Sequence, residues 1–156
     1  MKLTRVLTMT GLALGLVAGT AFAAGHDGPP PAVKARLGLM ANFAYNLGVL
    51  GEMAKGNTDY NADVAAVAAA NLAAFSATDQ SLLWTAGTDT GSISGTRALP
   101  KIWEAQADFG SKAIDLATAS VALAAAAGTD LAGLQGAIGG VGAACGACHK
   151  AYREPQ

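Results

Sequence analysis

The 156-residue chain is short of several residue types that common functional sites need. A Cys2His2 zinc site would need both cysteines and both histidines of the chain, and His26 is expected in the loose N-terminal segment, outside the predicted helices, which argues against such a site. Aromatic residues make up only 6% of the chain and β-branched residues are scattered, which favours helices over strands. A Ser-His-Asp set, paired catalytic carboxylates and a phosphate-binding loop are also missing, so we predict that the protein is not an enzyme.

A long hydrophobic run is missing as well, but a short one stands near the N-terminus. Lys2 and Arg5 precede the apolar segment 11–17, and Ala21-Phe22-Ala23 matches a small-residue cleavage site. The segment is too short for a comfortable membrane span, and no second hydrophobic stop follows it. Residues 1–23 are therefore predicted to be a signal peptide, with an uncleaved anchor as the alternative.

Excess positive charge is absent from the rest of the chain. Removal of residues 1–23 leaves eight basic and eleven acidic residues, a net charge of −3, over 133 residues. This balance argues against a protein that binds nucleic acid, and no nucleic-acid partner is expected. Residues 24–156 are predicted to form one exported domain, located in a bacterial periplasm and without a membrane span after cleavage.

Apolar residues recur at helical spacing over four segments that Gly, Pro, Asn and Asp separate. The expected helices cover 32–55, 62–75, 100–128 and from Thr129 or Asp130 to about 152, with a long connection at 76–99. Short joints between amphipathic helices indicate an all-α, antiparallel up-down-up-down four-helix bundle. The last helix should turn a seam inward that consists of Leu131, Leu134, Ile138, Val141, Cys145, Cys148 and Tyr152.

The segment Cys145-Gly146-Ala147-Cys148-His149 carries the most specific signal in the chain. Two thiols three positions apart, followed directly by an imidazole, are the spacing of c-type haem attachment. On a helix the three groups lie within about one turn on one face. We predict one covalent haem c in the core near one end of the bundle, with Cys145 and Cys148 as thioethers and His149 as the proximal iron ligand.

The cysteine pair has two alternative interpretations, a redox-active dithiol and a structural disulfide. A thioredoxin-like dithiol belongs near a βαβ pattern, and no strand is predicted before this one. A structural disulfide between positions i and i+3 would close a very short loop and stabilise the fold little.

Two methionines remain after cleavage as candidates for the second axial position, Met40 and Met53. In an up-down-up-down bundle the start of the first helix lies beside the end of the last. Met40 lies roughly 12 Å from its helix start and His149 roughly 8 Å from its helix end, whereas Met53 lies about 30 Å along. Met40 is therefore the predicted distal iron ligand; the alternative is a flexible methionine that fills the core.

Arg36 stands on the apolar seam of the first expected helix, where a guanidinium needs an anionic partner. Haem carries two propionates, and Arg forms bidentate pairs with carboxylates. Arg36 is predicted to bind a propionate; an Arg that extends to solvent near the helix start is the alternative.

Together these features resemble the cytochrome c′ family, the class II c-type cytochromes, over the whole mature chain. The last block is the most specific of the segments that carry the resemblance: Val33-Lys34-Ala35-Arg36, Asn46-Leu47-Gly48, Met53-Ala54-Lys55-Gly56, Ala86-Gly87-Thr88, Ile102-Trp103, Val141-Gly142-Ala143-Ala144-Cys145 and Tyr152-Arg153. The resemblance implies a four-helix bundle with His149 as proximal ligand and Arg36 near a propionate. Most members are five-coordinate, but Met40 at the distal position is similar to the low-spin branch. Leu37 departs from the polar residue that many members have there.

The leading hypothesis is a periplasmic one-electron carrier with a six-coordinate His149–Fe–Met40 haem. The alternative is a five-coordinate protein that binds nitric oxide or carbon monoxide, which would require Met40 to be unligated or displaced. A peroxidase would need a distal His or acid on the first helix, and that helix has no His and no acid near position 40. The expected partners are unidentified redox proteins. The resemblance also implies a possible homodimer through the first two helices.

Overall fold

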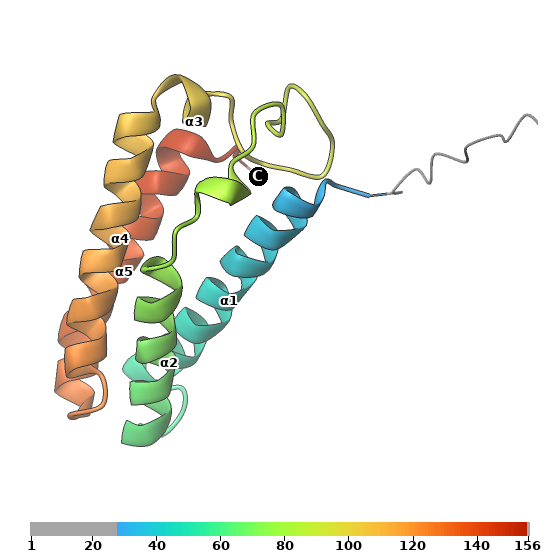
Figure 1. Ribbon diagram of the computed structural model, residues 1–156. Coiled ribbons are helices and arrows are strands. Elements are labelled where there is room, and N and C mark those ends of the chain that lie inside the picture. Colours follow the sequence, from blue (N-terminus) through green and yellow to red (C-terminus); the bar gives the residue numbers. More distant parts are fainter. Residues whose placement is uncertain (1–27, 156) are drawn as a thin grey trace, which may run out of the picture.

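The computed structural model describes residues 28–155, which form an all-helical bundle (Figure 1). The elements are α1 Pro31–Ala54, α2 Ala62–Ser76, the 3-10 turn η1 Ser81–Leu83, α3 Lys101–Glu104, α4 Gln106–Ala126 and α5 Leu131–Tyr152. Four long helices agree with the predicted fold class. The predicted signal peptide, residues 1–23, lies outside the described residues.

Local sequence signals set most of the helix ends. Pro31 occupies the first turn of α1, where its missing N–H costs nothing. Just beyond the end of α1, Gly56 adopts a φ of +75°, a conformation that side chains disfavour. The side chain of Asn61 accepts the N–H of Val64 at the start of α2, and Asp130 accepts the N–H of Gly133 at the start of α5. Both caps confirm the prediction.

The third expected helix is wrong in one respect, because it is broken near its start. Pro100 precedes the four-residue α3, and Ala105 then adopts a non-helical φ of −126° and ψ of 48° before α4 begins. The cause is tertiary. Ile102 is buried, and the indole Nε1–H of Trp103 donates to the carbonyl of Trp84 at 2.9 Å. These contacts turn α3 toward the long connection, and no local breaker announces the bend.

The helices enclose one main core and a smaller one. α1 packs on α2 and α5, and α4 packs on the same two helices, as in an up-down-up-down bundle. The first cluster draws aliphatic and alanine side chains from all four long helices, including Leu50, Leu72, Leu123 and Leu134. The second cluster lies at the α3 end and centres on Ala98, Ile102 and Tyr152. The end of the bundle that holds the second cluster also holds the C-terminus of α5 (Figure 1).

The long connection is joined to the end of α5 through the main chain. The N–H of Leu99 donates to the carbonyl of Tyr152 at 3.0 Å, and the N–H of Glu154 donates to the carbonyl of Arg97 at 2.9 Å. Ala98 and Arg153 form an antiparallel bridge between these two bonds. The connection therefore closes over the last turn of α5.

Among the described helices, α4 and α5 are long and apolar enough to cross a membrane by length and composition. Both helices are rich in alanine, and they pack on each other and on α1 or α2. The core helices of a bundle have the same length and composition.

Candidate functional site

The cysteine–histidine motif occupies the last two turns of α5. Both thiols are free and half-buried. Cys145 packs against the first hydrophobic cluster, whereas Cys148 packs against the second. The core is therefore divided at the motif, and an apolar group tethered to both sulfurs would meet hydrophobic surface on two sides. The donor set fits a covalently attached haem, with an imidazole on the residue that follows the second thiol.

Electrostatics distinguish this motif from a redox-active dithiol. Burial raises the pKa of the Cys145 thiol, and burial followed by the charge of Cys145 raises the pKa of the Cys148 thiol. Reactive dithiols have the opposite shift, because the thiolate must be accessible. Burial lowers the pKa of His149, with the charges of Arg153 and Arg97 as smaller causes. The imidazole is thus held in its neutral form, which is the form that binds metals.

The two methionines lie in different parts of the core. Met40 is half-buried and packs against the first cluster, as does Cys145 on the neighbouring helix α5. Met53 is buried near the other end of α1, where its sulfur accepts the N–H of Asn61 at 3.5 Å. The structure therefore places Met40, and not Met53, in the half of α1 that begins at the motif end of the bundle.

Arg36 is 3% exposed, and its guanidinium is bound by the long connection. Nη1 donates to the hydroxyl of Thr88 at 2.8 Å and to the carbonyl of Leu83 at 3.5 Å. Nη2 donates to the carbonyl of Thr88 at 2.5 Å and to the hydroxyl of Thr96 at 2.6 Å. The guanidinium also lies 5.2 Å from the ring centroid of Trp84. Burial lowers the pKa of Arg36, and nearby Asp89 opposes that shift.

These contacts differ from the prediction, in which Arg36 either binds a propionate or extends to solvent. The four terminal N–H groups of the guanidinium are used by the connection, and within residues 28–155 only the Nε–H makes no hydrogen bond. Thr88 and Thr96 lie 52 and 60 positions from Arg36, so no local pattern could identify them. Arg36 is thus an anchor for the connection as well as a candidate ligand for an anion.

Aromatic side chains pack together in the second cluster, against which Cys148 also packs. Trp84 meets Phe109 edge to face at 4.8 Å between ring centroids, and Phe109 meets Tyr152 in the same way at 5.3 Å. The hydroxyl of Tyr152 donates to the carboxylate of Asp108 at 2.5 Å. This bond is the largest cause that raises the pKa of Tyr152 to about 12. Tyr152 was predicted to pack in the core, and its burial confirms that prediction.

Comparison with known proteins assigns this arrangement to a family. Residues 31–153 match the sequence profile described as Cytochrome C'. A cytochrome c-554 from Cereibacter sphaeroides is 47% identical over 122 residues, which cover 78% of this chain and 92% of that protein. The crystal structure of cytochrome c' from Thermochromatium tepidum is 37% identical, with a TM-score of 0.72 over 80% of this chain and 95% of that one.

A further solved cytochrome c', 28% identical, covers 82% of this chain and 99% of its own with a TM-score of 0.74; it is described as having an unusual ligand-controlled dimer dissociation. The profile match spans every described helix and the Cys145–His149 motif. The chain therefore belongs to the cytochrome c′ family, the class II c-type cytochromes, with haem c as its cofactor.

Proposed function

We propose that the protein is a periplasmic one-electron carrier in which Met40 and His149 are the two axial ligands of the haem iron. The observation that carries the proposal is the position of Met40, which is half-buried on α1 against the same cluster as Cys145 on α5. A thioether at this place provides the second axial ligand of a His–Met pair, which raises the reduction potential.

The other residues of the site have distinct roles in this proposal. Cys145 and Cys148 hold the cofactor through thioether bonds, and the neutral imidazole of His149 binds from the proximal side. Arg36 offers its remaining Nε–H to a haem propionate while its other donors hold the connection. When bound, haem c supplies an iron that alternates between the ferrous and ferric states. Occupation of both axial positions by protein groups limits rearrangement between those states.

A matched pair of methionine variants tests the distal ligand. In the ferric protein we expect a far-red methionine-to-iron charge-transfer band, and in the ferrous protein we expect little binding of carbon monoxide. Met40→Leu should abolish the band and allow carbon monoxide to bind the reduced iron. Met53→Leu should change neither property, because Met53 lies in the core at the other end of α1.

The opposite result would support the alternative function. A wild-type protein without the far-red band, which binds carbon monoxide as readily as Met40→Leu, would be a five-coordinate gas-binding cytochrome. The carrier proposal would then be wrong, while the attachment of haem through Cys145 and Cys148 would stand.

Covalent attachment has its own test. Replacement of both Cys145 and Cys148 by Ala should allow acidified organic solvent to extract the haem, which the wild-type protein should retain. His149→Ala should keep the haem attached but change its visible spectrum. Haem that is extracted from the wild-type protein would contradict the thioether assignment.

For export, we propose that residues 1–23 are removed and that residues 24–156 act as a single periplasmic domain without a membrane span. The measurement is the mass of the protein purified from the periplasmic fraction, which should correspond to a chain that begins at Ala24 with one haem attached. A mass that includes residues 1–23, with the protein in the membrane fraction, would indicate the uncleaved anchor.

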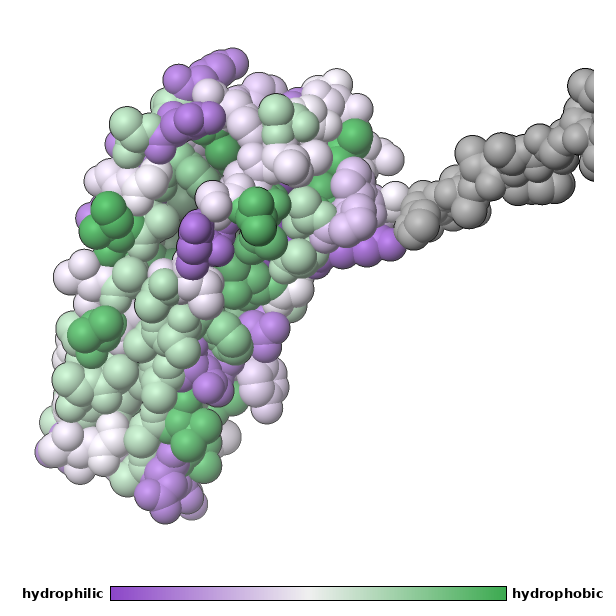
Figure 2. Space-filling view, in the orientation of Figure 1, coloured by the Kyte–Doolittle hydropathy of each residue, from purple (hydrophilic) through white to green (hydrophobic). Residues whose placement is uncertain are grey.

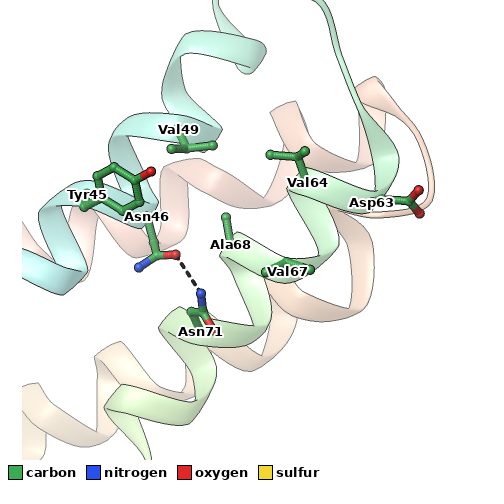
Figure 3. A pocket seen from close by; sticks show the side chains of 8 residues that line it. All are labelled: Tyr45, Asn46, Val49, Asp63, Val64, Val67, Ala68 and Asn71. Atoms are coloured by element: carbon green, nitrogen blue, oxygen red, sulfur yellow. Dashed lines mark hydrogen bonds between the residues drawn. The ribbon is translucent and has the colours of Figure 1, made fainter.

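For assembly, we propose a homodimer through the outer face of α1 and α2. A groove of about 340 Å³ lies there between Tyr45 on α1 and Val64 and Val67 on α2 (Figure 3). Tyr45 is 72% exposed and Val67 is 62% exposed, so this face displays apolar surface to solvent. Sedimentation analysis should give twice the monomer mass, and Val67→Glu should return the protein to the monomer. A monomeric wild type would refute the proposed dimer.

A further inference from the structure

Charge is distributed unevenly along the bundle. The end with the two helix turns has four acids against one base: Glu52, Asp59, Asp63, Asp130 and Lys55. At the other end, the first turns of α1 and α4, the connection, α3 and the end of α5 carry seven bases against five acids: Lys34, Arg36, Arg97, Lys101, Lys112, Lys150, Arg153, Asp79, Asp89, Glu104, Asp108 and Glu154. Figure 2 shows strongly hydrophilic side chains at both ends and in the middle of the visible face, and few along its α4 flank. The end of the bundle with the last turn of α5 is therefore locally positive, although the net charge of the chain is negative.

Four of these bases surround the last turn of α5, and we name them the basic face: Arg97, Lys101, Lys150 and Arg153. Arg97 is placed there by its hydrogen bonds to the carbonyl of Glu154. Lys101 lies with its Nζ 5.8 Å from the ring centroid of Tyr152. Lys150 on α5 and Arg153 just beyond its end are exposed. The basic face thus adjoins the proposed proximal ligand.

The charges of the basic face are not neutralised by ion pairs. The ion pairs among residues 28–155 join Lys55 to Glu52, and Lys112 to Asp108 and Asp115. Asp108, which accepts the hydroxyl of Tyr152, is therefore already paired with Lys112. The other acids at this end, Asp79, Asp89, Glu104 and Glu154, form no ion pair with the basic face. Within residues 28–155, all four cations therefore remain available to a partner.

We propose that the basic face is the docking surface for the acidic surface of a redox protein. This inference rests on the proposed function, because it names the place and chemistry of contact for an electron carrier. Complementary charge steers encounter and orients partners, and it raises association rates by about 10- to 1,000-fold. A partner seated on the basic face stands within one helical turn of His149, so electrostatic orientation and short electron transfer coincide.

The proposal is tested by whether the rate of oxidation of the reduced protein rises or falls with ionic strength. For a given oxidant, the net charge of the protein and the basic face predict opposite changes. The probes are hexacyanoferrate(III) and tris(phenanthroline)cobalt(III), two oxidants of opposite charge. Each accepts one electron from the reduced protein and becomes hexacyanoferrate(II) or the cobalt(II) complex, with no atom transferred. Steering by the basic face makes the hexacyanoferrate rate fall, and the cobalt rate rise, as ionic strength increases. The reverse pattern would follow the net charge of −3 and would overturn the proposal.

Single charge reversals locate the effect. Lys150→Glu and Lys101→Glu alter the basic face, whereas Lys55→Glu makes the same change in net charge at the other end of the bundle. At about 0.1 M ionic strength the Debye length is about 10 Å, so distant charges are screened. We expect each of the first two variants to slow oxidation by hexacyanoferrate about fivefold at that ionic strength, with little effect of Lys55→Glu. Equal effects of all three variants would contradict the proposal.

A binding measurement complements the rates. Paramagnetic hexacyanochromate(III), which is not reduced, should broaden the amide signals of residues 97–101 and 150–154 in the ferrous protein and spare those of 52–63. Broadening spread evenly over the surface would refute a specific face. Failure of Met40 ligation would appear in the visible spectrum and leave the salt dependence unchanged. The failures of the two proposals are therefore distinguishable.

Discussion

The two ends of the bundle are stabilised by different kinds of contact. At the end with the α1–α2 and α4–α5 turns, helices pack through fully buried aliphatic side chains such as Leu50 and Leu134. At the end that carries the motif, a buried guanidinium, two threonine hydroxyls and a tyrosine–aspartate bond hold the connection and α3 against the helices. The first end relies on the hydrophobic effect, and the second relies on polar contacts between residues distant in sequence.

The two kinds of contact have different roles, one in the stability of the fold and the other in the geometry of the site. Aliphatic packing between adjacent helices forms a stable scaffold whatever the site contains. Buried polar groups stabilise less on balance but fix one arrangement, because each unsatisfied group is costly. The molecule uses this second kind of contact where the cofactor and its ligands must be positioned.

The largest effect is expected from a cavity at the aliphatic end. Leu134 is fully buried, so Leu134→Ala should lower the free energy of unfolding by about 2–5 kcal/mol. Urea denaturation of the ferric protein gives this value. The matched control is Leu82→Ala, since Leu82 is 84% exposed and should cost little. A loss below 1 kcal/mol at Leu134 would show that this end does not carry the stability.

A somewhat smaller loss is expected at the polar end. Arg36→Met keeps an unbranched apolar stem but leaves the carbonyl of Thr88 without its side-chain donor and the hydroxyl of Thr96 with only the N–H of Ala98, which should cost about 2–3 kcal/mol. Limited proteolysis should then cut the connection between residues 83 and 99 faster. Arg36→Lys is the control, because one ammonium can restore part of the network. If Arg36→Met left the cleavage rate unchanged, Arg36 would not anchor the connection.

The bond between Tyr152 and Asp108 should appear in the pH dependence of stability. The pKa of Tyr152 is raised in the folded protein to about 12 from an ordinary value of 10. Between these values the unfolded chain loses the phenolic proton before the folded protein does, so stability should fall as pH rises from 10 to 12. Tyr152→Phe should remove this part of the decline in the urea midpoint, and Asp108→Asn should reduce it. Identical pH profiles for the three proteins would refute the role of the bond.

The smallest predicted effect has the opposite sign. Ser120 is fully buried on α4, and among the described residues its hydroxyl has no hydrogen-bond partner. Ser120→Ala should raise the free energy of unfolding by about 0.5–1 kcal/mol, because it removes a desolvated hydroxyl and improves helix propensity. The exposed Ser111 on the same helix provides the control, since Ser111→Ala gains propensity alone. A destabilised Ser120→Ala variant would reveal a use for the hydroxyl.

The sequence was informative where structure depends on neighbours in the chain. Helix periodicity and the caps at Asn61 and Asp130 predicted the bundle, and the buried or half-buried seam of α5 agrees with the predicted inward positions. The cysteine–histidine spacing identified the cofactor class before any coordinates. The break at Ala105 and the threonine partners of Arg36 could not be predicted, because their causes lie in residues about 20 to 60 positions away.

The main-chain pairing of residues 97–99 with 152–154 has a consequence for the iron ligand. Helix ends normally fray, and His149 stands in the last turn of α5, where fraying would be greatest. The backbone hydrogen bonds of Tyr152 and Glu154 attach that turn to residues 97–99 of the long connection. The imidazole in the last turn of α5 is thereby protected from the fraying that its position would otherwise bring.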